Sequence, residues 1–288
     1  MTGAVADEVR LVEGGPREGA AASDWVRPHV VGRPRPVVVL GVSGPACYLA
    51  AEDGTVIALE AGGTGVTLPN ALVLDPRGPG VTGVVTGDRG HLGAGGLRIR
   101  DRTVAVGRWW NPRPRIGPLD PAHLRRRRAA LPTCSTDHAI YGLVGPVDDL
   151  RAAARRSDAD GVAAVVGDLL GRGPGSTPAG DDVLAGMLAT LRVLGGAHVG
   201  ATRVADALAS ALRAAVHRTS ALSATLLRCA DDGAVVGAAR RVLEVLPGDA
   251  ALTGPVTALA RLGHTSGHDL LTGIGIAVDL VTTGREAT

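Results

Sequence analysis

The sequence predicts an α+β protein in which an N-terminal β-sandwich or barrel-like domain precedes a C-terminal helical domain. Short apolar runs, separated by glycine and proline, fill the first half at a spacing typical of a sandwich or barrel. From Pro146 onward the apolar residues recur instead at the helical period of about 3.6 residues. Strands gathered before helices are typical of an α+β chain. We predict a β-rich domain over 1–108, a crossover with a short helix over 109–132, and a helical domain over 133–288.

The composition argues against a nucleic-acid-binding or membrane protein. The chain has 288 residues, of which 45% are hydrophobic, and a formal net charge of only +2. It has neither a strongly basic balance nor an apolar run of the ~18 residues that a membrane span needs. Its three cysteines stand far apart, which fits neither a disulfide framework nor a zinc site. Because the first ten residues also lack an apolar signal core, we expect a cytoplasmic protein with no nucleic-acid or membrane partner.

Seven apolar runs in the first half predict strands. Because the chain contains no phenylalanine, Val, Leu and Ala must fill the core between them. Asp53-Gly54 and Asp101-Arg102 predict hairpin turns. The glycine clusters at 62–65 and 93–96 are interpreted as turns, and the alternative of phosphate loops is weaker because no helical pattern follows them. The predicted strands are Val37–Val42, Cys47–Ala50, Thr55–Leu59, Ala71–Leu74, Val81–Val85, Leu97–Ile99 and Thr103–Val106.

The second half begins with a proline-rich crossover at 109–119, which excludes both helix and central strand. Asp120-Pro121 then predicts the start of a short helix that carries four arginines, Arg125–Arg128. We interpret these arginines as a solvated helix face, and a surface for an anionic substrate or partner is the alternative. Further helices are predicted at 147–156, 159–170, 178–194, 201–216, 220–230, 235–246, 253–262 and 267–282.

The glycine-rich segment 171–186 is the strongest candidate for a binding site. Its glycines and prolines interrupt regular structure just before a helical pattern begins. Thr177 before Pro178 predicts an N-cap followed by a proline at the first helical position. Asp181 and Asp182 then fall in the first turn, where carboxylates suit the helix dipole. A glycine loop that leads into a helix presents unpaired N–H groups to an anion, whereas the two carboxylates favour a cation or a polar substrate group.

A second segment, 263–274, repeats this pattern once a single residue is gapped. Interior glycine costs about 1 kcal/mol relative to alanine, so Gly186 and Gly273 indicate close approach of another backbone or of a ligand. Ordinary capping, including a capping box from Ser266 to Asp269, is the alternative for each copy. We expect the two helix beginnings to meet and to enclose one small anion. The matched pairs are Gly175/Gly263, Thr177/Thr265, Gly180/Gly267, Asp182/Asp269, Leu184/Leu271 and Gly186/Gly273.

A third polar cluster lies between the two segments. Thr219 or Ser220 can cap the helix that follows, and Ser223, one turn into it, can face the same pocket. A catalytic triad of Ser223, His264 and Asp269 is conceivable. However, no serine here occupies the strand–turn–helix elbow that holds such nucleophiles.

Together these three clusters resemble the AllH family, a subunit type of oxamate carbamoyltransferase in anaerobic allantoin breakdown and formerly a domain of unknown function. The resemblance covers about 165–282 well and the N-terminal half loosely. Ser176 stands where the family tends to carry leucine, and Ala179 where it tends to carry serine, so the resemblance leaves the substrate open. The residues that carry it are Gly173–Asp182, Thr219–Ser223 and Gly263–Asp269.

The resemblance implies carbamoyl transfer between carbamoyl phosphate and oxamate, and it implies partner subunits. Both substrates are small anions, which helix N-termini can hold. Asp182 and Asp269 are expected to orient the amide or a metal, and His264 or His268 to handle a proton. Substrate binding is expected from Gly173, Gly175, Ser176, Thr177, Gly180, Asp181, Thr219, Ser220, Ser223, Thr265, Ser266 and Gly267.

Two alternatives remain open from the sequence. One is a metal-dependent hydrolase in which Asp181, Asp182 and Asp269 bind Mg²⁺. Adjacent helical residues point about 100° apart, which weakens this alternative. The other is a non-catalytic scaffold or regulatory subunit. No cofactor is firmly expected, and Mg²⁺ is kept as a candidate.

Overall fold

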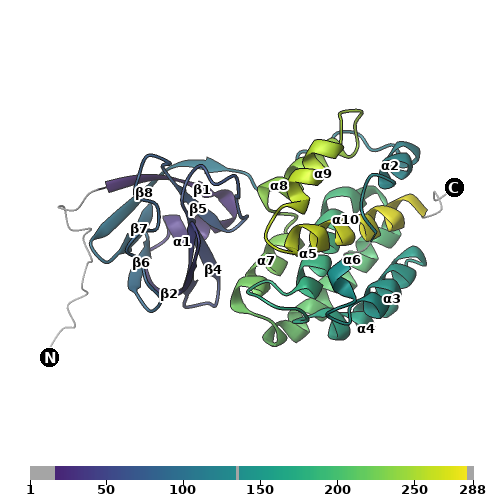
Figure 1. The fold of residues 1–288 in the computed structure, drawn as a ribbon, viewed down its shortest axis with the longest axis horizontal. Coiled ribbons are helices and arrows are strands. Elements are labelled where there is room, and N and C mark those ends of the chain that lie inside the picture. The colour runs from purple at the N-terminus through teal and green to yellow at the C-terminus, as the bar shows by residue number, and fades with distance from the viewer. Residues whose placement is uncertain (1–16, 134–135, 284–288) are drawn as a thin grey trace, which may run out of the picture. The chain divides into compact units, whose positions relative to one another are not determined.

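The computed structural model describes residues 17–133 and 136–283, and the chain divides into two compact units (Figure 1). The barrel unit contains the residues up to Thr64 together with Ala71–Trp110. The helical unit contains Gly65–Asn70 and the residues from Asn111 onward. Each unit has a hydrophobic core of its own. The protein is therefore α+β, as predicted, while the finer division at residues 108 and 132 remains a prediction.

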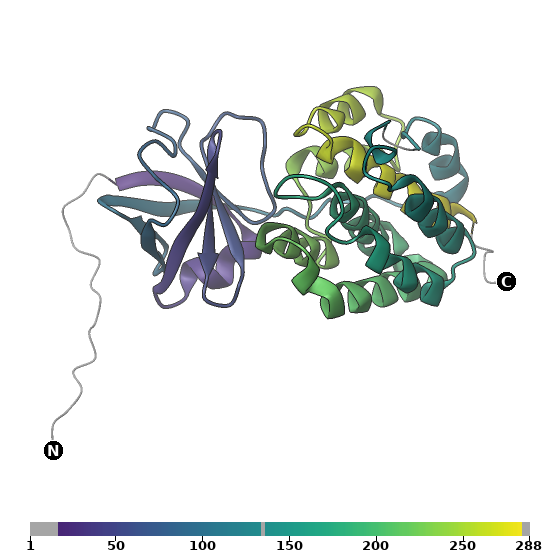
Figure 2. The ribbon, with the colours of Figure 1, turned by 60° about the horizontal axis from the view of Figure 1, so that its bottom comes forward.

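The strands described in the barrel unit close into an eight-stranded barrel (Figures 1 and 2). They are β1 (Arg17–Ser23), β2 (Arg35–Ser43), β3 (Ala46–Ala51), β4 (Val56–Glu60), β5 (Ala71–Leu74), β6 (Arg89–Gly93), β7 (Gly96–Ile99) and β8 (Arg102–Trp110). Around the barrel they follow the order β1-β5-β4-β3-β2-β6-β7-β8. The β1–β8 and β4–β5 pairs are parallel, and the other neighbours are antiparallel. Helix α1 (Arg27–Val31) follows β1 after a 3-10 turn.

The barrel core consists of Val, Leu, Ile and Ala together with Cys47, as the absence of phenylalanine leads one to expect. Two strands were missed, because β1 and β6 are rich in glycine, alanine and charge rather than in apolar runs. The predicted strand Val81–Val85 is wrong: these residues form turns and loop, and Val81 and Val84 are nevertheless buried. Their burial explains the apolar signal.

The predicted turns mostly hold. β3 and β4 form the expected hairpin, in which Gly54 has a φ of +77°. The glycine cluster at 93–96 joins β6 to β7, with φ angles of +48° at Ala94 and +89° at Gly95, as a tight hairpin turn requires. The turn between β7 and β8 lies one residue earlier than predicted, because Arg102 already belongs to β8.

Every predicted helix is present in the helical unit, with ends shifted by a few residues. The helices are α2 (Pro121–Arg128), α3 (Val144–Arg155), α4 (Ala159–Leu169), α5 (Ala179–Leu194), α6 (Val199–Ala215), α7 (Ala221–Asp231), α8 (Gly237–Val245), α9 (Thr253–Ala260) and α10 (Ser266–Thr283). Helices α5 and α10 are buried along most of their length and pack side by side within this unit (Figures 1 and 2). None of the helices described is both long and apolar enough to span a membrane. The cytoplasmic location remains a prediction.

The arginines of α2 hold that helix against its neighbours. Arg128 forms an ion pair with Asp279 of α10 at 2.8 Å, and Arg125 donates to the carbonyl oxygen of Thr282. Arg127 donates to the carbonyl oxygen of Ala250 at 2.6 Å. The interpretation as a solvated face is therefore incomplete, because three of the four guanidinium groups already have structural partners.

Candidate functional site

Helices α5 and α10 cross in direct backbone contact at the two matched glycines. A Cβ atom on Gly186 would collide with the carbonyl oxygen of Leu270, and one on Gly273 would collide with that of Val183. The two contacts are reciprocal, because each carbonyl lies three residues before the matched glycine of its own helix. The matched segments therefore meet, as predicted. The two contacted carbonyls belong to the residues directly after the matched aspartates, and the two glycines lie four residues after them.

The beginnings of the two helices are also packed in the same way. A Cβ on Gly180 would collide with the carbonyl oxygen of Leu169 in α4, and one on Gly267 with that of Leu259 in α9. Each glycine thus lets its helix start against the helix that precedes it. The repeated sequence corresponds to a repeated structure of helix, glycine loop and helix.

The predicted caps of these helices are not those observed. Pro178, rather than Thr177, is the N-cap of α5, and no side chain caps this helix. The Thr177 hydroxyl lies 3.2 Å from the Ser266 hydroxyl, so it joins the two segments instead. The capping box is also wrong, because Ser266 already belongs to α10 and the Asp269 amide donates to the Thr265 carbonyl. The placement of both aspartates of α5 in its first turn is confirmed.

Asp181 joins the third polar cluster to the first. One carboxylate oxygen, Oδ1, accepts a hydrogen bond from the Gly171 amide at 2.6 Å. The other, Oδ2, accepts from the Ser223 hydroxyl at 2.5 Å and from the Thr219 hydroxyl. Asp181 is buried, so these three donors replace water around its charge. Both of its oxygens are engaged within the protein.

Ser220, one of the two residues predicted to cap the third helix of the site, is the N-cap of α7. Its hydroxyl accepts from the Ser223 amide at 3.0 Å and donates to the Ser176 carbonyl at 2.5 Å. Because Ser223 faces Asp181, the triad that would use Ser223 with His264 and Asp269 is not formed.

Asp182 is buried among other carboxylates at the crossing. Burial raises the pKa of Asp182 well above its ordinary value, and the charges of Asp269 and Asp181 raise it further. Hydrogen bonds with the Ser266 and Thr177 hydroxyls oppose this shift without cancelling it. The environment thus favours the neutral acid, which can donate a hydrogen bond.

The histidine that contacts this cluster is not among the residues predicted from the sequence. His138, in the 3-10 turn Thr136–His138, places Nε2 2.7 Å from Oδ1 of Asp269. Both side chains have an exposed fraction of 0%. His264 and His268 are exposed, and their role in proton transfer remains a prediction. No motif identifies His138, because its contact with Asp269 joins residues 131 positions apart.

Two buried oxygens in the cluster have no hydrogen-bond partner among the described residues: Oδ2 of Asp182 and Oδ2 of Asp269. The two side chains are 6% and 0% exposed. A buried polar atom without a partner costs roughly 1–3 kcal/mol, so a molecule that hydrogen-bonds to these two oxygens would be stabilised here. We therefore treat this pair of atoms as the centre of the candidate site.

The described side chains provide little support for a metal at this position. No group of three or more His, Cys, Asp or Glu side chains within residues 17–133 and 136–283 is arranged to hold an ion. Asp181, one of the three ligands of the hydrolase alternative, already accepts three hydrogen bonds.

A match to a protein family includes nearly all residues of this site. Residues 169–278 match the AllH model. That model describes the oxamate carbamoyltransferase subunit AllH, so the resemblance is confirmed over these residues. The AllH match includes both glycine segments and the cluster Thr219–Ser223, whereas His138 lies outside it. Neither the curated proteins nor the solved structures contain a match to the chain.

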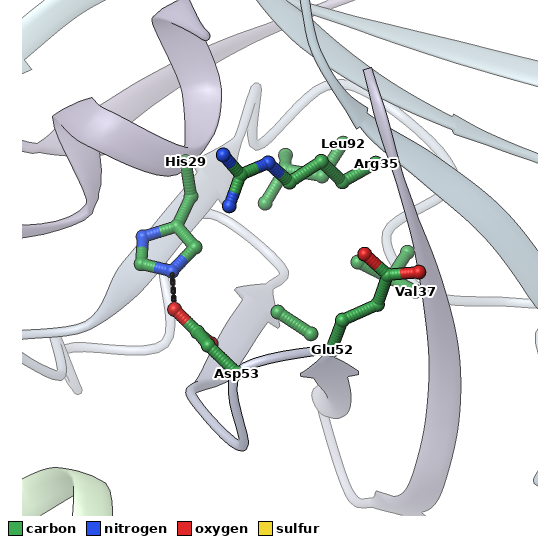
Figure 3. A pocket seen from close by; sticks show the side chains of 7 residues that line it. His29, Arg35, Val37, Glu52, Asp53 and Leu92 are labelled. Atoms are coloured by element: carbon green, nitrogen blue, oxygen red, sulfur yellow. Dashed lines mark hydrogen bonds and ion pairs between the residues drawn. The ribbon is translucent and has the colours of Figure 1, made fainter. Parts of the chain in front are cut away.

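A separate pocket lies in the barrel unit, outside the AllH match. In Figure 3 the His29 and Asp53 side chains meet at its edge, with Nε2 of His29 3.0 Å from Oδ2 of Asp53. Burial would raise the pKa of Asp53, but hydrogen bonds from Thr55 and His29 lower it to about 2. No sequence motif indicates this pocket. Its lining is His29, Arg35, Val37, Ala51, Glu52, Asp53 and Leu92.

Proposed function

We propose that the helical unit provides a substrate site of a carbamoyltransferase that acts on carbamoyl phosphate and oxamate or its carbamoylated product, oxalurate. The observation that carries this proposal is the buried pair Asp182 and Asp269, held where two matched helix beginnings meet. This pair lies inside the residues that match the oxamate carbamoyltransferase subunit. A subunit acts with other subunits, so the proposal includes partner chains.

The glycine loop before α5 is suited to hold the anionic end of a substrate. Gly171, Gly173 and Gly175 all have positive φ angles, which glycine adopts without strain. A Cβ on Gly171 would collide with the carbonyl oxygen of Arg218, and one on Gly167 would lie 3.3 Å from the Arg218 guanidinium. Arg218 thus lies with its backbone against the loop and with its guanidinium against α4, the helix that leads into the loop. The backbone N–H groups of a glycine loop at a helix N-terminus favour phosphate or carboxylate.

Carbamoyl transfer needs positioning and charge stabilisation more than a protein nucleophile. The amide nitrogen of oxamate attacks the carbamoyl carbon of carbamoyl phosphate, the bond from that carbon to the phosphate oxygen breaks, and the nitrogen loses one proton. In our proposal Asp182 and Asp269 orient the reacting amide. His264, just before α10, and His268, in its first turn, remain candidates to carry the proton, and His138 holds Asp269 in place through the contact of its Nε2.

The test is alanine replacement of Asp182 and Asp269 in the complex assembled with its partner subunits. We expect each variant to lose at least about a hundredfold in carbamoyl transfer, comparable to the removal of one oriented polar group. Asp149→Ala, an exposed change on α3, is the matched control. Transfer at near wild-type rate by both folded variants would overturn the proposal. If the protein also bound neither oxamate nor carbamoyl phosphate, a scaffold role would follow.

A further inference from the structure

We propose that Oδ2 of Asp182 and Oδ2 of Asp269 bind the two edges of one primary amide group. The pair would therefore select an amide, and neither a carboxylate nor a metal ion. This inference rests on the proposed function and adds to it the part of the substrate that the buried cluster recognises. It also assigns His138 as a positioning residue.

The first step is that each carboxyl group has one atom left for a ligand. His138 occupies Oδ1 of Asp269 at 2.7 Å. The hydroxyls of Ser266 and Thr177 hydrogen-bond the carboxyl group of Asp182. The remaining oxygen of each group is buried and has no partner among the described residues. The two residues are close enough for the charge of Asp269 to act on Asp182.

The second step is that the two open atoms differ in hydrogen-bonding character. The titratable groups that act on Asp182 are Asp181 on its own helix and Asp269 on α10. His138 in turn contacts Asp269. Burial, with the charges of the two other aspartates, raises the pKa of Asp182 and favours its O–H form, a donor. The charge of Asp269 that acts on Asp182 is that of a carboxylate, which can only accept, so in the hydrogen bond with Asp269 the Nε2 of His138 donates. Oδ2 of Asp269 is then an acceptor.

The third step is the match to a ligand. A donor beside an acceptor complements a primary amide, whose carbonyl oxygen accepts and whose NH₂ group donates. A carboxylate or phosphate presents acceptors alone and would face the Asp269 oxygen without a proton between them. A divalent cation would require both acids to be ionised. Oxamate and carbamoyl phosphate both carry a –C(=O)NH₂ group, and their anionic ends are left to the glycine loop.

The experiment compares oxamate with oxalate, in which a carboxylate replaces the amide, by calorimetry on the full chain with its partner subunits. We expect oxamate to bind at least about tenfold more tightly, because a site built for an amide leaves buried groups unpaired with the analogue. Asp182→Asn keeps a donor and should change the oxamate affinity less than about threefold. Asp269→Asn must present a donor either to His138 or to the ligand, so it should lose at least about tenfold.

A pH series sharpens the test. Raising the pH through the raised pKa of Asp182 removes the donor, so wild-type affinity for oxamate should fall, whereas Asp182→Asn should be insensitive over the same range. Equal affinities for oxamate and oxalate would overturn the inference. So would tight Mg²⁺ binding that Asp182→Asn abolishes. If transfer still depended on both aspartates, the proposed function would stand without the amide preference. If transfer survived both alanine variants, the proposed function itself would fail.

Discussion

The beginnings of α5 and α10 share a backbone arrangement and differ in the chemistry of their side chains. Each has a glycine as its second residue, in contact with the preceding helix, and each crosses the other at an interior glycine. At the position before the matched aspartate, however, α5 has the buried Asp181 and α10 has the exposed His268. The aspartates themselves differ too, because hydroxyls surround Asp182 and a histidine binds Asp269. The repeat thus sets the positions, and residues outside the repeat determine what each carboxyl group can do.

The largest expected effect comes from removing the partner of Asp269. His138→Ala leaves a fully buried carboxylate without its hydrogen bond and should lower the free energy of unfolding by about 3–5 kcal/mol. Chemical denaturation measures this loss. In a double-mutant cycle with Asp269→Ala, we expect a coupling of about 2 kcal/mol or more, since the pair is in direct contact. Additive losses would show that His138 does not act through Asp269.

A somewhat smaller effect is expected at the crossing that the two copies share. A Cβ on Gly273 would collide with the Val183 carbonyl and lie 2.6 Å from the Met187 amide nitrogen. Gly273→Ala should therefore destabilise the protein by about 3 kcal/mol, the upper range for overpacking. The control is Gly254→Ala in α9, where a Cβ meets nothing within 4 Å. It should be neutral or slightly stabilising. Equal stability of the two variants would contradict the direct backbone contact.

Loss of a hydrogen bond to Asp181 should lower the free energy of unfolding by about 2 kcal/mol more than truncation of its counterpart His268. Ser223→Ala removes a hydroxyl that donates to the buried Asp181 carboxylate, and bonds to charged groups contribute about 1.5–3 kcal/mol. His268→Ala, at the matched exposed position, should stay within about 0.5 kcal/mol of wild type. Thermal unfolding of both variants measures the difference. Similar shifts would mean that the copies have not diverged here.

The shared backbone arrangement could be predicted from the sequence, whereas the different contacts of the side chains could not. The helical period and the glycine spacing predicted every helix and the meeting of α5 with α10, because both are local patterns. β1 and β6 were missed since a barrel strand need not carry an apolar run. The contacts of Asp181 and Asp269 were missed for a different reason. Their partners lie as far away as Ser223 and His138, and a lone serine or histidine carries no spacing signal.

Asparagine at the two matched aspartates should have effects of opposite sign, and the effect at Asp182 is the smallest of those expected here. Burial and two neighbouring carboxylates raise the folded-state pKa of Asp182, so the unfolded chain releases this proton at lower pH than the folded protein. The contribution to stability is complete below the unfolded pKa and is lost as pH rises through the folded one. Asp182→Asn removes that loss and should stabilise the protein at neutral pH by about 1 kcal/mol, a usual size for one favourable change. At pH 3 the gain should vanish.

Asp269→Asn provides the matched comparison, because it breaks a buried pair and should destabilise the protein at neutral pH. Urea denaturation of both variants at pH 3 and pH 7 separates the two cases. If both substitutions shifted stability in the same direction at pH 7, the two aspartates would share one protonation state. The arrangement of one donor beside one acceptor would then be wrong.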